Sequence, residues 1–317
     1  MKKYTHAWIA FKAVERLAKV QLADANKPFA DYLINWFEDH KDGVIRGAWY
    51  PDEIIKDNST SHVLKHKPLN ETPLAFRVLP STSLLYILGK TSPLRGKAYT
   101  LGASGNLPDR CEALSHSVID NLRIREREDK GSSLTPTDNH IALILFMLSH
   151  YIADAHMPMH CDARKDDFLG FNLHAEAEQL WEEDVVRSYE IDRFHQRFRY
   201  NPQGFPLLKN DPSHATSILK SVEDELNARE FQIGYGQHND NVREYITAVC
   251  QHSYLLSYAW LPKDVTPAVF DRPALQTAGA LPFRDMSIAA LSDAVDAVAR
   301  VWLRDLRRYM KWEKEQI

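Results

Sequence analysis

The sequence predicts an all-α protein folded as one compact multi-helix domain over residues 1–317. Apolar residues recur at three- and four-residue spacings along most of the chain, which is typical of amphipathic helices. No stretch alternates apolar and polar residues as a half-buried strand does, and no internal repeat divides the chain. With 317 residues, 44% of them hydrophobic, the chain can bury a sizeable core without disulfides.

The predicted helices begin at the amino terminus, where Thr5 is the expected N-cap. A second helix is expected at about residues 27–38, and residues 41–80 have no clean period, which indicates a functional loop inside a compact domain. The nearly continuous apolar run Ile141–Leu148 predicts a helix buried on most sides, ending near Pro158. Other helices are predicted at about residues 76–89, 110–129, 172–189, 211–230, 239–261 and 285–315.

The charge balance narrows the classes of partner and compartment. Lys and Arg number 39 against 43 Asp and Glu, so the net charge of −4 does not indicate a global electrostatic grip on nucleic acid or on an anionic membrane, although it is compatible with a local basic groove. No run of about 18 apolar residues predicts a membrane span. Charged residues interrupt the apolar start of the chain, which is untypical of a signal peptide. The 3 cysteines form no CxxC pair, which fits a reducing compartment. A cytoplasmic protein is therefore expected.

The last predicted helix carries a row of cations on one face. At their spacing these residues indicate the solvated face of a packed amphipathic helix, with contact to a membrane or to RNA as the alternative. They are Arg300, Arg304, Arg307, Arg308 and Lys311.

Histidine is concentrated in one segment of the chain, well above its density elsewhere. His150 and Asp154 are four residues apart on a predicted helix, so both side chains lie on one face and can converge on one cation. His174 and Glu178 repeat this spacing on the next helix. Imidazole and carboxylate together suit zinc, and several carboxylates fit a multinuclear site. The five histidines of this segment are His140, His150, His156, His160 and His174.

A single such pair is more often a surface ion pair or a satisfied core histidine than a metal site. Two pairs joined by His160, directly after the Pro that ends the first helix, favour metal binding. His156 follows Asp154 by two residues, so it is expected to point away from the pair, at the surface or behind the ligands. His140 is expected to face solvent, and Cys161 to be structural.

The pattern His150-x3-Asp154-x5-His160-x13-His174-x3-Glu178 resembles the zinc-site signature of the bacterial zinc-dependent phospholipase C and fungal S1/P1 nuclease superfamily. The segment HYIADAHMPMH is similar to that family's central motif. Upstream, His6-Ala-Trp8 resembles its first histidine, and the segment from Asp52 to His62 resembles its Asp and His pair on a loop. These motifs lie within residues 6–178; residues 200–317 are expected to be a helical extension of the same domain.

The resemblance implies a fold of that family's all-α type and a cluster of two or three zinc ions. One zinc would be bound by Asp52, His62, His150 and Asp154, and a second by His160, His174 and Glu178. The third would be bound by His6 and the amino terminus, with Asp154 bridging; without it the site is dinuclear. His66, four residues after His62, remains the rival loop ligand.

The residue types and positions around the cluster predict further roles. Asp52 is the expected group to orient or deprotonate the attacking water, or is a ligand only. Trp49 and Tyr50 are expected to wall the cleft beside it, and Phe168 and Arg164 to contact the substrate from the loop after His160.

The predicted function is a zinc-dependent hydrolase that cleaves phosphate esters by means of metal-activated water. Glu178 favours the phospholipase C-like branch, because the nuclease branch usually has Asp in that position. The expected partner is a small phosphate ester, either a phospholipid head group or a nucleotide, with no stable nucleic-acid partner. The alternatives are a single-strand nuclease or nucleotidase, and a non-catalytic helical protein that binds zinc structurally.

Overall fold

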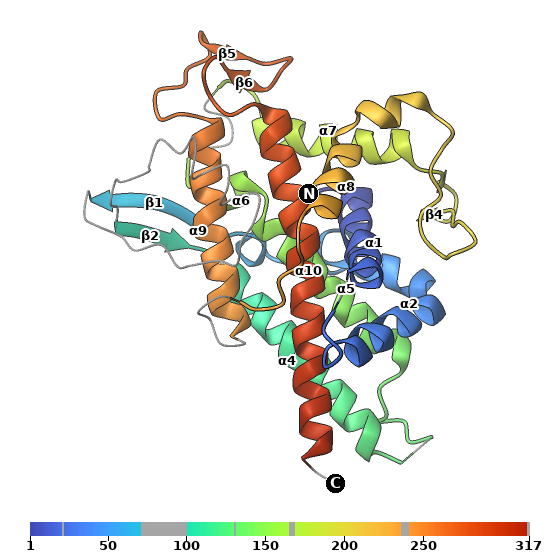
Figure 1. Ribbon diagram of the computed structural model, residues 1–317. Helices are drawn as coiled ribbons and strands as arrows, with labels where there is room; N and C mark the ends of the chain where they lie inside the picture. Colours follow the sequence, from blue (N-terminus) through green and yellow to red (C-terminus); the bar gives the residue numbers. More distant parts are fainter. Residues whose placement is uncertain (21, 71–99, 130, 165–168, 236–240, 316–317) are drawn as a thin grey trace.

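Helix α5 (Asp138–Ala155) lies at the centre of the computed structural model (Figure 1), which describes residues 1–20, 22–70, 100–129, 131–164, 169–235 and 241–315. Thr137 caps α5 by accepting a hydrogen bond from the His140 amide, and every residue from Ile144 to Ala155 is buried. The burial follows from helices packed around α5: α1 (Lys3–Lys19), α2 (Lys27–Gly47), α4 (Leu107–Arg127), α9 (Val242–Trp260) and α10 (Phe283–Lys314).

The prediction of a mostly helical, compact domain is confirmed. Among the described residues, the helices that complete it are α6 (Pro158–Cys161), α7 (Leu173–Ser188) and α8 (Ile218–Ala228). Short turns join them: the π-helix η1 (Pro51–Ile55) and the 3-10 turns η2 (Ser59–His62) and η3 (Pro212–Thr216). The predicted helix at residues 76–89 lies outside the described residues. Within the described ranges, no helix combines the length and the hydrophobicity that a membrane span requires.

The expectation that strands are absent is wrong, because small antiparallel pairs occur between the helices. The largest joins β1 (Lys65–Asn70) to β2 (Thr100–Ser104), with Lys65 opposite Ser104. Two-residue strands pair in the others: β3 (Ile191–Asp192) with β4 (Arg197–Phe198), and β5 (Phe270–Asp271) with β6 (Gln276–Thr277). Strands of two residues are too short to show an alternating pattern in the sequence.

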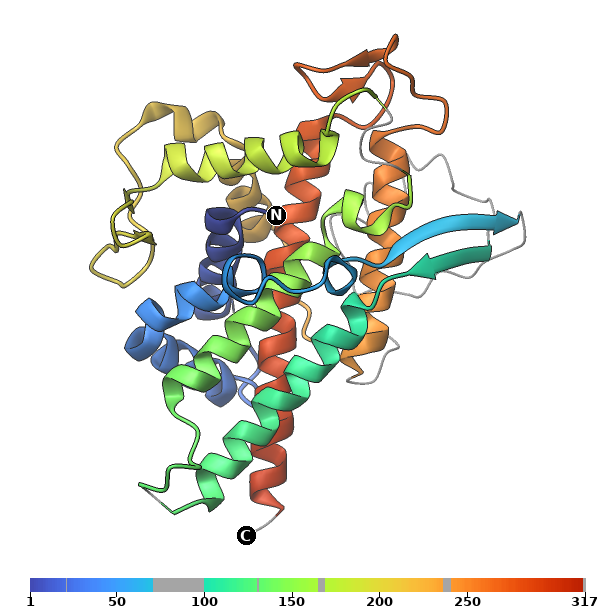
Figure 2. The ribbon, with the colours of Figure 1, turned by 180° about the vertical axis from the view of Figure 1, so that it is seen from behind.

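Helix α2 continues to Gly47, well past the predicted end near residue 38. Its last turn lies directly on α5, and a Cβ atom at Gly47 would come within 2.7 Å of the Phe146 Cβ. Glycine is therefore required for this close approach, which lays the segment after α2 against α5. Figure 2, seen from behind, shows that segment running across α5.

The start of α1 also differs from the prediction. The helix begins at Lys3, and Thr5 is a buried residue within it rather than its N-cap. The Glu182 side chain on α7 supplies the missing cap, because it accepts hydrogen bonds from the amides of Tyr4 (3.0 Å) and Thr5 (2.8 Å) and from the Thr5 hydroxyl (3.0 Å). A carboxylate at a helix N-terminus satisfies free N–H groups and the helix dipole together. Glu182 thereby fixes the first residues of the chain against α7.

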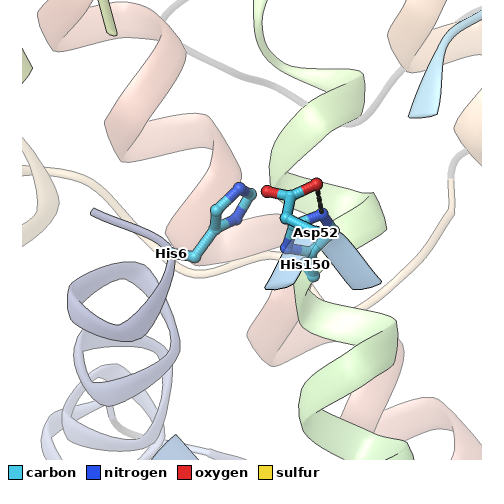
Figure 3. Close-up of side chains that lie close together, drawn as sticks. All are labelled: His6, Asp52 and His150. Atoms are coloured by element: carbon cyan, nitrogen blue, oxygen red, sulfur yellow. Dashed lines mark ion pairs between the residues drawn. The ribbon is translucent and has the colours of Figure 1, made fainter. Parts of the chain in front are cut away.

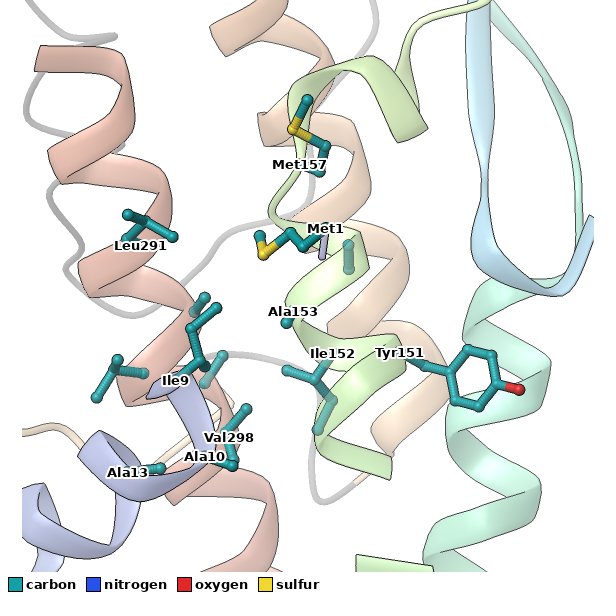
Figure 4. Packing of buried hydrophobic residues seen from close by; sticks show 14 of the residues in the cluster. Met1, Ile9, Ala10, Ala13, Tyr151, Ile152, Ala153, Met157, Leu291 and Val298 are labelled. Atoms are coloured by element: carbon teal, nitrogen blue, oxygen red, sulfur yellow. The ribbon is translucent and has the colours of Figure 1, made fainter. Parts of the chain in front are cut away.

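Small residues let α1 pack closely into the core (Figure 4). Ala10 and Ala13 lie on the face of α1 that meets α10, where Val298 is buried, and Ile152 of α5 packs nearby. Helix α10 is buried along most of its length, which makes it the long support on which the other helices pack. The placement of Arg300 on the solvated face is wrong: its side chain is buried, and it donates to the Gln232 carbonyl oxygen and the Tyr245 hydroxyl.

Candidate metal centre

The last turn of α5 forms the centre of the candidate site. His150 and Asp154 are both buried, and the His150 Nε2 lies 3.3 Å from the Asp154 Oδ2. The Ala48 carbonyl oxygen lies 2.8 Å from the His150 Nδ1. Because a carbonyl oxygen only accepts, Nδ1 is the donor in this hydrogen bond, and Nε2 is the ring nitrogen that faces the cluster. The close approach of α2 to α5 thus fixes the orientation of the His150 ring.

The segment between α2 and β1 brings Asp52 and His62 to this end of α5. The Asp52 Oδ1 lies 3.6 Å from the His150 Nε2 and 3.7 Å from the His62 Nδ1. The His62 Nδ1 lies 2.9 Å from the Asp154 Oδ2 and 3.2 Å from the His150 Nε2. Asp52 differs from its neighbours in exposure, since 47% of its side-chain surface is open to solvent.

Helix α1 supplies the third side of the site. The His6 ring stacks on the His150 ring, with 3.9 Å between their centroids, and its Nε2 lies 3.6 Å from the Asp154 Oδ1. Figure 3 shows His6, Asp52 and His150 side by side, each from a different segment. The amino group of Met1 lies 3.2 Å from the Asp154 Oδ1 and 2.6 Å from the Glu178 Oε1.

A second group of donors comes from α6 and α7. Pro158 begins the short helix α6, which turns the chain so that the His160 Nδ1 lies 3.4 Å from the Asp154 Oδ1. The His160 Nε2 is 2.9 Å from the His174 Nε2, and that nitrogen is 2.7 Å from the Glu178 Oε1. His174 and Glu178 are therefore one helical turn apart and face the same point, as the spacing predicted.

His66 lies outside this group of donors. It is buried against the Tyr254 ring, with 5.8 Å between centroids, and pairs with Asp162 as an isolated β-bridge. Burial lowers the pKa of the His66 imidazole to about 4. Of the two rival loop histidines, His62 is the one that the fold brings beside Asp154.

Burial and charged neighbours shift the pKa values of the histidines in different directions. Burial alone would lower the pKa of His62, but the hydrogen bond to Asp154 and the charge of that carboxylate raise it. Burial lowers the pKa of His6, with the nearby His150 and the Met1 ammonium acting in the same direction. Burial also lowers the pKa of His160. Burial alone would raise the pKa of Asp154, but the Met1 ammonium, His160 and His150 hold it well below its usual range.

The carboxylates in turn act on the amino terminus. Burial alone would lower the pKa of the Met1 amine, but Glu178 and Asp154 outweigh that effect and raise it to about 11. The pKa of Glu178 is held well below its usual range: burial opposes ionisation, and the Met1 ammonium, His160 and His174 favour it. In this structure the Met1 ammonium is thus a cation held between two carboxylates.

The donor atoms fit metal ions better than they fit one another. Both ring nitrogens of His6 and the Nδ1 of His160 are buried without a hydrogen-bond partner among the described residues. Two donor atoms on one tetrahedral zinc lie about 3.3 Å apart, given metal–nitrogen distances of about 2.0–2.1 Å. The nitrogen–nitrogen distances of 3.2 Å between His150 and His62 and 2.9 Å between His160 and His174 are close to that value.

Three groups within the described residues have donor atoms close enough to share an ion. Two contain His150, and the third corresponds to the predicted His–His–Glu site. The groups are His6, Asp52 and His150; His62, His150 and Asp154; and His160, His174 and Glu178. All eight predicted ligands therefore lie in or beside one continuous cluster, with Asp154 in contact with both halves of it.

The predicted substrate residues are arranged less uniformly. Trp49 is buried, with the Lys3 ammonium 4.3 Å from its ring centroid. Tyr50 lines a groove of about 460 Å³ together with the exposed side chains of Ile54 and Phe194 and with charged side chains such as Arg46 and Arg197; Asp52 is not part of its lining. Phe168 lies outside the described residues.

Arg164 is engaged by the protein itself. Its guanidinium lies 2.6 Å from the Asp162 Oδ2 and donates to the Leu261 carbonyl oxygen at 2.7 Å. Asp162 is buried, and the Ser257 hydroxyl also donates to it. This arrangement ties the loop after His160 to α9, and it turns the guanidinium away from the role of a free phosphate contact.

Three further residues near the site were singled out in the sequence, and one more was not. His156 is buried rather than at the surface; its Nδ1 donates to the Ile152 carbonyl oxygen, and burial lowers the pKa of its imidazole to about 4. His140 is exposed and Cys161 is buried, both as expected. Glu182 was missed, although its spacing of four residues from Glu178 places both on one face of α7.

A contact between Asp57, Tyr151 and Arg110 lies behind the cluster, and no sequence pattern predicted it. Asp57 accepts a hydrogen bond from the Tyr151 hydroxyl at 2.6 Å, and the Arg110 Nε lies 3.4 Å from the same carboxylate. The Tyr151 ring in turn lies against the His62 ring, with 5.1 Å between centroids. This contact supports the loop that carries His62.

Neither the comparison with protein-family models nor the one with curated proteins finds a match to this chain. The buried His and Asp groups able to hold metal ions therefore stand as the principal functional evidence.

Proposed function

We propose that this chain is a zinc-dependent hydrolase of phosphate esters, with a phospholipase C-like activity. One observation carries the proposal: three donor groups, two of which share His150, lie around Asp154, while one carboxylate, Asp52, remains open to solvent. A structural zinc site is closed by four protein ligands, whereas a catalytic site keeps a position for water or substrate. The His160, His174 and Glu178 group has three ligands and so leaves such a position.

A phosphodiester gains negative charge on its oxygen atoms as it is cleaved, so catalysis needs cations and a nucleophile that is available at neutral pH. Zinc supplies both when bound, because it stabilises charge on oxygen and lowers the pKa of water toward 7. Asp154 and Glu178 hold the negative charge that retains the cations. The neutral rings of His6 and His160 offer lone pairs without adding positive charge.

Asp52 is the residue proposed to act on the attacking water. Its carboxylate is half exposed and lies within 4 Å of both His62 and His150. A carboxylate in that position orients a water by accepting its proton in a hydrogen bond and removes the proton as the bond to phosphorus forms. The buried Asp154 cannot take this role, because its two oxygens already face the amine and four imidazoles.

The favoured substrate class is a phospholipid head group or a similar small phosphodiester. Glu178 agrees with the phospholipase C-like pattern. A groove at the start of η1 contains Tyr50, Ile54 and Phe194, which suit an apolar acyl or glyceryl part, next to charged side chains such as Arg46 and Arg197. The net charge of −4 disfavours tracking of a long polyanion. A nuclease or nucleotidase activity remains the alternative outcome of the substrate assay.

The test begins with elemental analysis of protein purified without a metal-affinity tag. Two or three zinc ions per chain are expected, followed by hydrolysis of phosphocholine esters in preference to single-stranded nucleic acid. Preference for nucleic acid would replace the phospholipase assignment with the nuclease one. A chain that binds no metal and cleaves neither substrate would refute the proposed function.

The role of Asp52 is tested separately with Asp52→Asn, which keeps the size of the side chain. Activity is expected to fall on the order of 10²-fold or more, the usual contribution of a general base. The exposed Asp224→Asn on α8 is the control for loss of one surface carboxylate. Unchanged activity of Asp52→Asn with normal metal content would show that Asp52 does not act on the water.

A further inference from the structure

A second binding site is indicated by a groove at the carboxyl-terminal end of α10, which we call the basic groove. Five cationic side chains line it, Arg304, Arg307, Arg308, Lys311 and Lys314, together with Phe29 at the start of α2. Its volume is about 290 Å³, at the lower end of the range of small-ligand sites, about 300–1,000 Å³. Figure 1 shows this end of α10, marked by the carboxyl terminus, at the opposite end of the molecule from α7.

The spacing of the cations places them on one face of the helix. Residues 304, 307, 308 and 311 are three or four apart in sequence, so they are neighbours on successive turns. No acidic side chain of the described residues lines the groove, and Arg307, Arg308 and Lys314 make no ion pair within the described part of the chain. Such a concentration of positive charge is unusual in a chain with a net charge of −4.

The helix dipole explains only part of this charge. Cations stabilise the last turn of a helix, and Lys311 and Lys314 occupy that turn of α10. Arg304 and Arg307 lie ten and seven residues before the helix ends at Lys314, beyond the reach of this effect. Burial lowers the pKa of the Arg304 guanidinium, Tyr235 acts to raise it, and the like charges of Arg307 and Arg308 act to lower it. A bound anion would relieve the repulsion between these like charges.

The types of residue indicate the chemistry of the ligand. Arginine presents a planar fork of donors that matches the oxygens of a phosphate group, and here three arginines lie within two turns. Phe29 and Met310 add an apolar wall beside them. We propose that the basic groove binds a small organic phosphate with at least two phosphate groups and a flat ring, such as a nucleoside diphosphate, with the phosphates on the arginines and the ring against Phe29.

The experiment measures binding of adenosine diphosphate to the full chain by titration calorimetry. Saturable binding is expected, and Arg307→Gln/Arg308→Gln should weaken it about a hundredfold, on the basis of about tenfold for each lost charged contact. The matched control is Arg187→Gln/Arg243→Gln, which removes two exposed arginines on α7 and α9 that do not line the groove. Glutamine keeps most of the side-chain length, and circular dichroism checks that each variant is folded.

A second set of measurements separates the basic groove from the metal centre and from other anions. Asp154→Asn should bind adenosine diphosphate as the wild type does, and inorganic pyrophosphate should bind more weakly because it has no ring. Equal binding by the double arginine variant, or loss of binding in Asp154→Asn, would overturn the site. Equal affinity for pyrophosphate would overturn the assignment of a ring-bearing ligand. Binding only to phosphatidylserine vesicles or to a single-stranded oligonucleotide would overturn the proposal of a small ligand.

Discussion

Two of the clusters of buried charged and polar residues in the described part of the chain, the Arg–Asp cluster and the candidate metal centre, are built in opposite ways. In the Arg–Asp cluster, Arg16 and Arg229 pair with Asp293 and Asp296: the Arg16 Nε donates to Asp296 at 2.9 Å, and Arg229 contacts Asp296 at 2.9 Å and Asp293 at 2.6 Å. Glu225 also lies 3.9 Å from the Arg229 Nη1. Both arginines thus face carboxylates of the protein itself, and the cluster ties the end of α8 to α1 and α10.

The metal centre shows the contrary pattern. Its carboxylates, Asp52, Asp154 and Glu178, face one ammonium group and five histidines, of which His6 and His160 are held neutral by their low pKa values. Ring nitrogens point at other ring nitrogens and at oxygens, and some have no partner at all among the described residues. The difference separates the two clusters: each arginine of the first faces a carboxylate of the protein, whereas the donor atoms of the second are grouped so that they could hold cations.

The strongest test of this contrast is Asp154→Asn. Because Asp154 contacts donors of both halves of the cluster, the variant is expected to lose more than one zinc per chain. Hydrolytic activity should fall on the order of 10³-fold, since several kcal/mol of transition-state stabilisation are lost with the metal. Elemental analysis and substrate turnover measure the two effects. Retention of full metal content would refute the bridging position of Asp154.

The converse substitution is Asp296→Asn in the Arg–Asp cluster. It leaves Arg16 and Arg229 incompletely paired in the interior, so the free energy of unfolding should decrease by about 3–5 kcal/mol. The metal content should stay unchanged, because this cluster shares no residue with the metal centre. Urea denaturation and elemental analysis provide the measurements. A parallel loss of zinc would show that the two clusters are one network.

Asp305 belongs neither to the Arg–Asp cluster nor to the metal centre, and its buried carboxyl should make the stability of the protein depend on pH. It is buried on α10 with only the Ser115 hydroxyl (2.6 Å) as a partner among the described residues, and burial raises its pKa to about 7. The carboxyl is thus neutral in the folded protein at low pH, and its contribution to stability is fully present below the unfolded pKa near 4. That contribution is lost as the pH rises from about 4 to about 7. The free energy of unfolding decreases over this range by about 4 kcal/mol, which corresponds to a difference of about three units between the folded and unfolded pKa values.

Asp305→Asn should remove this loss and make the protein more stable than the wild type above pH 7. Chemical denaturation at pH 5 and pH 8 measures the difference between the two proteins at each pH. The exposed Asp264→Asn serves as the control and should show no such change. A wild-type stability advantage that grows with pH would contradict the assignment of a raised pKa.

The smallest effect is expected for Glu182→Gln, which weakens the cap of α1 without touching a proposed ligand. Loss of charge at three hydrogen bonds should cost about 1–3 kcal/mol of stability. Because Glu182 holds the residues just before His6, zinc at the His6 side should bind about 10- to 100-fold more weakly, as for other positioning groups. Metal competition titrations measure this, with the exposed Glu183→Gln as the neighbouring control. Equal zinc affinity in the Glu182 and Glu183 variants would show that Glu182 does not contribute to zinc binding.

Local patterns predicted much of this molecule. The helical periods located α5, α7 and α10, and the four-residue spacing of His150 with Asp154 and of His174 with Glu178 placed each pair on one face. Contacts between residues far apart in the chain could not be predicted from local sequence patterns. The extension of α2 depends on Gly47 against α5, since residues 39–47 are mostly polar. The choice between His62 and His66 depends on the fold of a loop, and Glu182 acts on a helix that begins 179 residues earlier, at Lys3.

The wide separation of the donors along the chain has a kinetic consequence. His62 meets Asp154 across 92 residues, and His160 meets His174 across only 14. Closing a long loop costs more chain entropy than closing a short one, so the His160, His174 and Glu178 group can assemble early, while the His6 and His62 sides must wait for α1 and the η2 segment to dock. The first ion would then bind to a partly folded chain and the later ones would act as cross-links that close it, so that loading with zinc and the final step of folding become the same event.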